Sequence, residues 1–122
     1  MAAYNPGPGE YQVKQHLFDW RDADRRRDVP VLIYRPDGQD EPWPVVLFSH
    51  GVGSSRAGYR YLGRHWASHG YVAVHVTHVG SDDSAAAAAR GQTRRWMDEL
   101  MQDVDHRRER PRDLSFVLDC LA

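Results

Sequence analysis

The first half of the chain carries two segments in which β-branched and aromatic residues recur at the spacing of strands. These segments are Tyr11 to Trp20 and Val29 to Tyr34. The charged stretch between them, Arg21 to Asp28, is typical of an exposed turn. We therefore predict an antiparallel hairpin, whose second strand ends at the turn sequence Pro36-Asp37-Gly38.

The pattern changes at Pro44, after which Val45 to Phe48 form an uninterrupted apolar run. Such a run is expected of a strand that is buried on both faces of a parallel sheet. A second apolar strand is predicted at Tyr71 to Val76, with Val72, Val74 and Val76 on one face.

A helix is predicted between these two strands, because apolar residues recur there at helical spacing: Tyr59, Leu62 and Trp66. Ser54 or Ser55 is the expected N-cap, and Gly70 is the expected C-terminal cap. Strand, glycine loop, helix and strand in this order make a βαβ unit with two parallel strands.

The last third of the chain predicts helices. After a loop at Gly80 to Ser84, the alanine run Ala85 to Ala89 is interpreted as a helical spacer that buries little. Two apolar stripes follow, and Pro111 is expected in the first turn of the second helix. The stripes are Met97, Leu100, Met101 and Val104, then Leu114, Val117, Leu118 and Leu121.

Charged residues of both signs alternate on these helices, which predicts exposed faces with ion pairs. Cys120 lies beside the apolar stripe and is interpreted as a small core residue. The charged residues are Arg94, Arg95, Arg107, Arg108, Arg110 and Arg112 with Asp98, Glu99, Asp103, Asp105, Glu109 and Asp113.

Composition fits one globular domain, since the 122 residues are 41% hydrophobic and 27% charged. We expect residues 1–9 to form a flexible leader and residues 10–122 to form the domain. A net charge of −1 disfavours nucleic acid as a partner, and the absence of any apolar run of membrane-spanning length disfavours a membrane span. A single cysteine excludes an intrachain disulfide and favours the cytoplasm.

Candidate chemistry is concentrated in the loop that follows the first buried strand, Ser49-His50-Gly51-Val52-Gly53. Ligands and catalytic groups collect at this end of open α/β sheets. Glycines leave neighbouring amides unobstructed, so the loop could form an oxyanion hole. An ordinary glycine-rich turn or a phosphate-binding loop fits the same residues, and the sequence alone leaves these alternatives open.

Other histidines give weaker signals. His65 and His69 have the i, i+4 spacing of a zinc motif, but Trp66 stands where that motif has its glutamate, so we interpret both as exposed helix histidines. His75 and His78 flank a strand end near Asp82 and Asp83, where they could bind a metal or line a pocket. We predict no metal site.

The stretch from Pro44 to His78 resembles the N-terminal part of an α/β-hydrolase. The resemblance rests on two motifs in this stretch, Ser49-His50-Gly51-Val52-Gly53-Ser54 and Ala67-Ser68-His69-Gly70-Tyr71. The similarity is greatest to platelet-activating-factor acetylhydrolase-like and dienelactone-hydrolase-like enzymes. The resemblance implies a partial α/β fold, an antiparallel hairpin followed by a parallel βαβ unit with flanking helices. It also implies hydrolysis of small-molecule carboxylic esters through a serine acyl-enzyme, without a cofactor. The backbone N–H of Val52 is then an oxyanion donor supported by His50, Gly51 and Gly53. In this family the loop after the second strand lines the entrance of the active site, so the resemblance implies a position at the pocket rim for His78 and Asp82.

The nucleophile elbow of this superfamily, Gly-X-Ser-X-Gly, is absent from the chain. The resemblance therefore implies a domain truncated before its nucleophile, acid and base, and we predict that this chain alone is inactive. Ser55 is a minor candidate for the nucleophile. Apolar surface left uncovered by the truncation predicts self-association. The alternative is a small non-catalytic α/β binding domain that holds an anion at its glycine loop.

Overall fold

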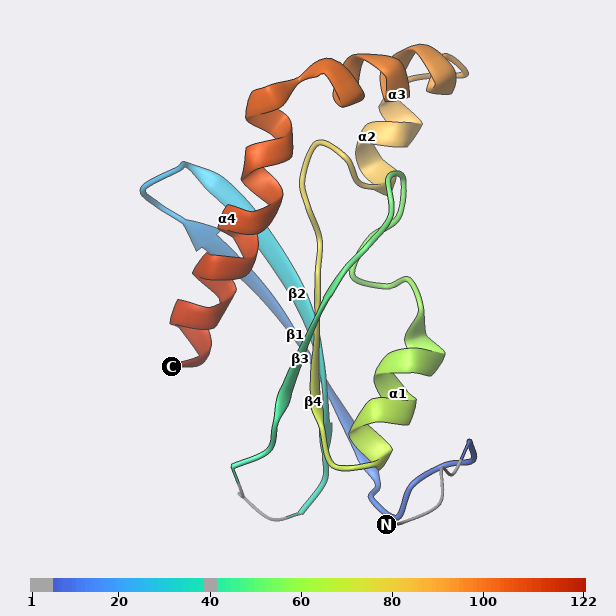
Figure 1. The fold of residues 1–122 in the computed structure, drawn as a ribbon, viewed down its shortest axis with the longest axis vertical. Coiled ribbons are helices and arrows are strands. Elements are labelled where there is room, and N and C mark those ends of the chain that lie inside the picture. The colour runs from blue at the N-terminus through green and yellow to red at the C-terminus, as the bar shows by residue number, and fades with distance from the viewer. Residues whose placement is uncertain (1–5, 39–41) are drawn as a thin grey trace.

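The computed structural model describes residues 6–38 and 42–122, which form one mixed four-stranded sheet with helices on both faces (Figure 1). The strands are β1 (Val13–Asp22), β2 (Arg27–Pro36), β3 (Val45–Ser49) and β4 (Val72–Val76). Their order in the sheet is β1-β2-β4-β3. β2 runs antiparallel to both β1 and β4, whereas β3 and β4 are parallel.

The helices are α1 (Arg60–Ser68), α2 (Asp83–Ala88), α3 (Thr93–Gln102) and α4 (Val104–Leu121). α1 and α4 cover opposite faces of the sheet (Figure 1). Alternate residues of β2 separate the two cores, because successive side chains of a strand point to opposite faces. Val31 packs in the cluster that includes Val117 of α4, and Leu32 packs in the cluster that includes Ala67 of α1.

The predicted hairpin is confirmed, but its strands extend further than the sequence pattern indicates. β1 and β2 continue into the charged stretch, where Arg21 stands opposite Asp28 and forms an ion pair of 2.7 Å with it. Cross-strand pairs of opposite charge stabilise an antiparallel ladder. The turn is therefore reduced to residues 23–26.

The predicted parallel βαβ unit is also confirmed, but α1 starts later than expected. Its N-cap is Tyr59, which has a φ of 57° and makes no side-chain capping bond, so the prediction of Ser54 or Ser55 as N-cap is wrong. Ser54 is instead held by the loop that follows β4, since its carbonyl accepts a hydrogen bond of 2.8 Å from Asp83 N–H.

The end of α1 has the predicted glycine cap. Gly70 has a φ of 95°, and its N–H donates to the carbonyl of Ala67 while the N–H of Tyr71 donates to that of Trp66. This pair of bonds is a Schellman motif, which glycine favours because it has no Cβ.

The C-terminal helices differ from the prediction. α4 begins at Val104, and Pro111 lies in its interior rather than in its first turn. Asp103 caps this helix by accepting a hydrogen bond of 3.0 Å from His106 N–H. Cys120, predicted in the core, is exposed. The alanine-rich α2 buries none of its side chains, as expected of a spacer.

The predicted leader is only partly described. Residues 1–5 lie outside the described residues, whereas Gly7 and Gly9 are attached to α1. The N–H of Gly9 donates to Ser68 Oγ at 2.9 Å, and Gly7 O lies 2.9 Å from His69 Nε2. The part of the leader that precedes β1 is thus bound to the end of α1.

Candidate functional site

The loops that follow β3 and β4 lie side by side beyond the carboxyl ends of these parallel strands. The N–H of Gly53 donates to Ser81 O at 2.8 Å, and Ser54 forms an isolated parallel bridge with Asp82. Asp82 also caps α2, because its side chain accepts a hydrogen bond from Ala85 N–H. The glycine loop is therefore held by the neighbouring loop at the edge of the sheet where functional groups of α/β proteins collect.

His50 is buried and its two ring nitrogens have fixed partners. Nε2 accepts a hydrogen bond of 2.9 Å from the backbone N–H of His78, and Nδ1 lies 2.7 Å from Gly51 O. A backbone N–H only donates, so the ring proton is on Nδ1 and donates to the Gly51 carbonyl. Burial lowers the pKa of His50, which keeps this neutral tautomer at physiological pH.

This arrangement orients the peptide bond between Gly51 and Val52. The Gly51 carbonyl accepts from His50 Nδ1 and from Ser54 N–H, at 2.7 and 3.1 Å. A planar trans peptide places the N–H on the side opposite its carbonyl. The Val52 N–H therefore points away from His50, it has no hydrogen-bond acceptor among the described residues, and Val52 is 43% exposed.

Arg110 of α4 reaches across to the same loop. Its guanidinium donates to His50 O at 2.6 Å, to Ser81 Oγ at 2.9 Å and to Ser49 Oγ at 3.3 Å. A planar guanidinium with several donors in fixed directions suits such a bridge. Arg110 thus joins α4 to the ends of both parallel strands.

Asp113, one turn further along α4, is fully buried and is surrounded by donors. It accepts hydrogen bonds from His78 Nδ1 at 2.8 Å, from Arg25 at 2.8 Å and from Arg27 at 2.8 and 3.0 Å. Burial by itself would raise the pKa of Asp113, but the hydrogen bonds from His78 and Arg27 outweigh it and lower the pKa to about 2. The carboxylate is therefore ionised at physiological pH.

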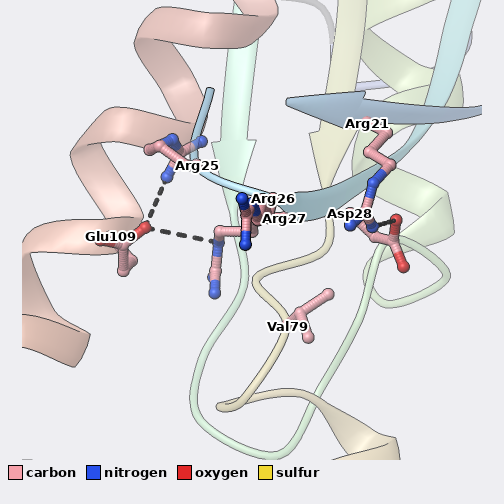
Figure 2. Close-up of a pocket in the computed structure, with 7 residues that line it drawn as sticks. All are labelled: Arg21, Arg25, Arg26, Arg27, Asp28, Val79 and Glu109. Carbon is pink, nitrogen blue, oxygen red and sulfur yellow. Dashed lines mark hydrogen bonds and ion pairs between the residues drawn. The ribbon is translucent and has the colours of Figure 1, made fainter. Parts of the chain in front are cut away.

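The hairpin arginines surround a pocket at the turn, shown in Figure 2. Arg25 and Arg27 both point toward Glu109 of α4, with atoms 2.7 and 3.8 Å from Glu109 Oε2. Arg21 pairs with Asp28 on the other side. Most of the arginines that line this pocket are paired with carboxylates. The ion pairs with Glu109 join the hairpin to α4.

The prediction of an exposed, ion-paired helix face holds for only part of the C-terminal region. Arg95 and Glu99 form an exposed i, i+4 pair at 3.2 Å. For Arg110 and Asp113 the prediction is wrong, because their partners lie on β1–β2, β3 and the loop after β4 rather than on the helix itself. Periodicity along a helix cannot reveal partners that are distant in sequence.

Several other histidines and acids stand apart from one another. His75 points to the α1 side of the sheet and its ring stacks on Phe48 at 4.8 Å, whereas His78 lies on the α4 side, so the two do not form one site. His78 and Asp82, which we expected at a pocket rim, are both buried. His65 and His69, expected to be exposed, are half-buried and in ring contact at 4.6 Å.

In the part of the chain that the structure describes, no three histidine, cysteine, aspartate or glutamate side chains are grouped so that they could hold a metal ion. No helix within that part is both long and apolar enough to cross a bilayer.

The mixed sheet, the β3–α1–β4 unit and the loop beyond it define a partial α/β-hydrolase fold. Residues 27–109 match the family model of platelet-activating factor acetylhydrolase, isoform II. Since this match covers more than half of the chain, the protein belongs to that family. The likeness to dienelactone hydrolases stays a prediction.

One curated relative is the platelet-activating factor acetylhydrolase of Cavia porcellus. The alignment is 36% identical over 77 residues and covers 57% of this chain and 17% of the relative. The chain therefore spans only a small part of the length of the relative that it matches.

Proposed function

We propose that this chain supplies one donor of the oxyanion hole of a serine hydrolase, and that this hydrolase acts on carboxylic esters of small or lipid-like acyl groups. The donor is the backbone N–H of Val52, supported by His50, Gly51 and Gly53. The 122 residues contain no Gly-X-Ser-X-Gly pattern, so this segment does not itself supply the nucleophile elbow that the acyl-enzyme route uses. The single cysteine is free, which favours a reducing compartment, and we place the protein in the cytoplasm.

The observation that carries this proposal is the orientation of the Gly51–Val52 peptide. Its carbonyl is bonded on one side by His50 Nδ1 and Ser54 N–H, which leaves the Val52 N–H directed outward without an acceptor among the described residues. A donor that is fixed before the reaction stabilises the negative charge of a tetrahedral intermediate without reorganisation. The resemblance to esterases implies the same role for this amide.

The test uses a longer protein in which this segment is joined to one that carries the nucleophile elbow. Gly53→Val should lower kcat/KM for p-nitrophenyl butyrate about 10²-fold or more, the effect of losing one oxyanion donor. Gly51→Val, which crowds the Val52 amide from the other side, should act in the same direction. The 122-residue chain by itself should show no sustained turnover of this ester.

Gly91→Val is the matched control for backbone strain. Gly91 and Gly53 have similar φ values, 84° and 88°, and a Cβ at Gly91 would meet no atom within 4 Å. Both substitutions therefore strain the backbone alike, but only Gly53 adjoins the Val52 amide. Equal losses of kcat/KM in the two variants, or sustained turnover by the 122-residue chain, would contradict the proposal.

A further inference from the structure

Ser49, His78 and Asp113 form a continuous hydrogen-bonded series that the proposed hydrolase function does not use. Ser49 Oγ lies 2.7 Å from His78 Nε2, and His78 Nδ1 lies 2.8 Å from Asp113 Oδ2. The three residues come from the end of β3, the loop after β4 and the middle of α4. A hydroxyl, an imidazole and a carboxylate in this order are the arrangement that activates a serine nucleophile, which is recognised by geometry rather than by chain order.

The protonation states fit the same chemistry. The Asp113 carboxylate has no proton to donate, so His78 carries its proton on Nδ1 and donates it to Asp113. The neutral form of the imidazole has a lone pair on Nε2 that can accept the proton of the Ser49 hydroxyl. His78 and Asp113 are fully buried, whereas Ser49 is exposed, so the hydroxyl is the member of the series that a reagent in solution can reach.

The charged side chains around Ser49, His78 and Asp113 both favour and limit a nucleophilic reaction of the Ser49 hydroxyl. Arg110 donates to Ser49 Oγ at 3.3 Å, and its positive charge favours an oxygen that gains negative character. Asp113 is shared with Arg25 and Arg27, so its ability to stabilise a protonated His78 is weaker than that of an unpaired carboxylate. These opposing effects favour reaction with activated electrophiles that carry good leaving groups, rather than turnover of ordinary esters or amides.

We propose that Ser49 is a reactive nucleophile, with His78 as its general base and Asp113 as the residue that positions the base, and that activated acyl and phosphonyl compounds modify it. With a fluorophosphonate, the Ser49 proton moves to His78 Nε2 as an Oγ–P bond forms and the P–F bond breaks. Fluoride leaves, and His78 then releases the proton to water. The product is one phosphonate ester on Ser49.

The experiment uses the 122-residue chain, in which the absence of a Gly-X-Ser-X-Gly pattern leaves Ser49 to be tested alone. The chain is incubated with a fluorophosphonate, and the modified residue is mapped by mass spectrometry of peptides. We expect one label per chain on Ser49. Ser49→Ala removes the attacking oxygen and should abolish this label, while Ser115→Ala should leave the labelling rate unchanged. Ser115 is an exposed serine of α4 and is not hydrogen-bonded to a histidine.

The role of His78 has its own readout. The labelling rate of the wild-type chain should fall as the pH is lowered, because a protonated imidazole cannot accept the Ser49 proton. His78→Gln should abolish labelling in a chain whose circular dichroism spectrum is unchanged, and if that variant unfolds, the pH profile alone decides the role of His78. Labelling at Ser55, no labelling, equal rates in the wild type and Ser49→Ala, or a pH-independent rate would each overturn the proposal. These outcomes are separate from the test of the Val52 amide, which needs the longer protein.

Discussion

At the scale of single residues, Asp113 holds the hairpin turn, β2 and the loop after β4 against α4 through its hydrogen bonds to Arg25, Arg27 and His78. Its neighbours Glu109 and Arg112 suggest a solvated helix face, yet its side chain is fully buried and bonded to residues 35 to 88 positions away. A solvated helix face and a face with one buried carboxylate can carry the same local pattern of charges, so the sequence does not predict the burial of Asp113. The position of the glycine loop, by contrast, could be predicted, because the apolar run before Gly51 and Gly53 places this loop at a strand end.

Asp113→Asn should lower the free energy of unfolding at pH 7 by about 3–5 kcal/mol, because it removes the one fully buried carboxylate of the cluster and leaves Arg25 and Arg27 with Glu109 alone as a shared partner. Urea denaturation measures this change. The matched control is Asp119→Asn on the exposed face of α4, for which we expect a change within about 0.5 kcal/mol. Similar changes in both variants would contradict the structural role of Asp113.

The same carboxylate predicts a pH dependence of stability. The pKa of Asp113 is about 2 in the folded chain and 3.8 as the ordinary value, so the folded state favours the ionised form. Its stabilising contribution is present above pH 4 and is lost as the pH falls from about 4 to about 2, by on the order of 2 kcal/mol. Denaturation of the wild type and Asp113→Asn across this range should show a steeper loss in the wild type, and parallel curves would contradict the ionised state assigned to Asp113.

At the scale of elements, periodicity predicts β2, β3, β4 and α1 because each carries apolar residues that pack into one of the two cores. It fails at α4, where an aspartate cap at Asp103 starts the helix early and the packing of Val117 keeps it continuous past Pro111. It also does not reveal how closely α1 approaches the sheet. A Cβ at Gly63 would collide with the ring of Tyr34 and lie 2.7 Å from His75 Nε2.

Gly63→Ala should therefore destabilise the protein by about 1–3 kcal/mol, as overpacking of a well-packed core does. Helix propensity alone predicts the opposite sign, because alanine in place of glycine stabilises an unhindered helix by about 1 kcal/mol. The sign of the change in urea denaturation distinguishes the two effects. Arg64→Ala, on the exposed side of the same helix, is the control and should change little. A more stable Gly63→Ala chain would show that α1 can move away from β2 and β4.

At the scale of the whole molecule, the two outer strands of the described sheet differ in how they oppose association. β1 carries charged side chains along its length, at Lys14, Asp19, Arg21 and Asp22. β3 carries none, and Val45 at its start is 46% exposed. Charges on an outer strand are a usual protection against pairing with another chain. Which apolar surface stays uncovered depends on sheet order, which the pattern along the chain does not specify.

We therefore expect the 122-residue chain to associate through β3 as its concentration rises, with a mean mass by light scattering that exceeds that of the monomer. Val45→Lys places a charge on this strand and should shift the chain toward the monomer, since a second chain would have to bury that charge. Tyr61→Lys is the matched control, because Tyr61 is a large exposed side chain, 67% exposed, on α1 and away from the outer strand. If both substitutions lowered the mean mass equally, general surface apolarity rather than β3 would drive association. A wild-type chain that stays monomeric at high concentration would show that its outer strand is protected by another means.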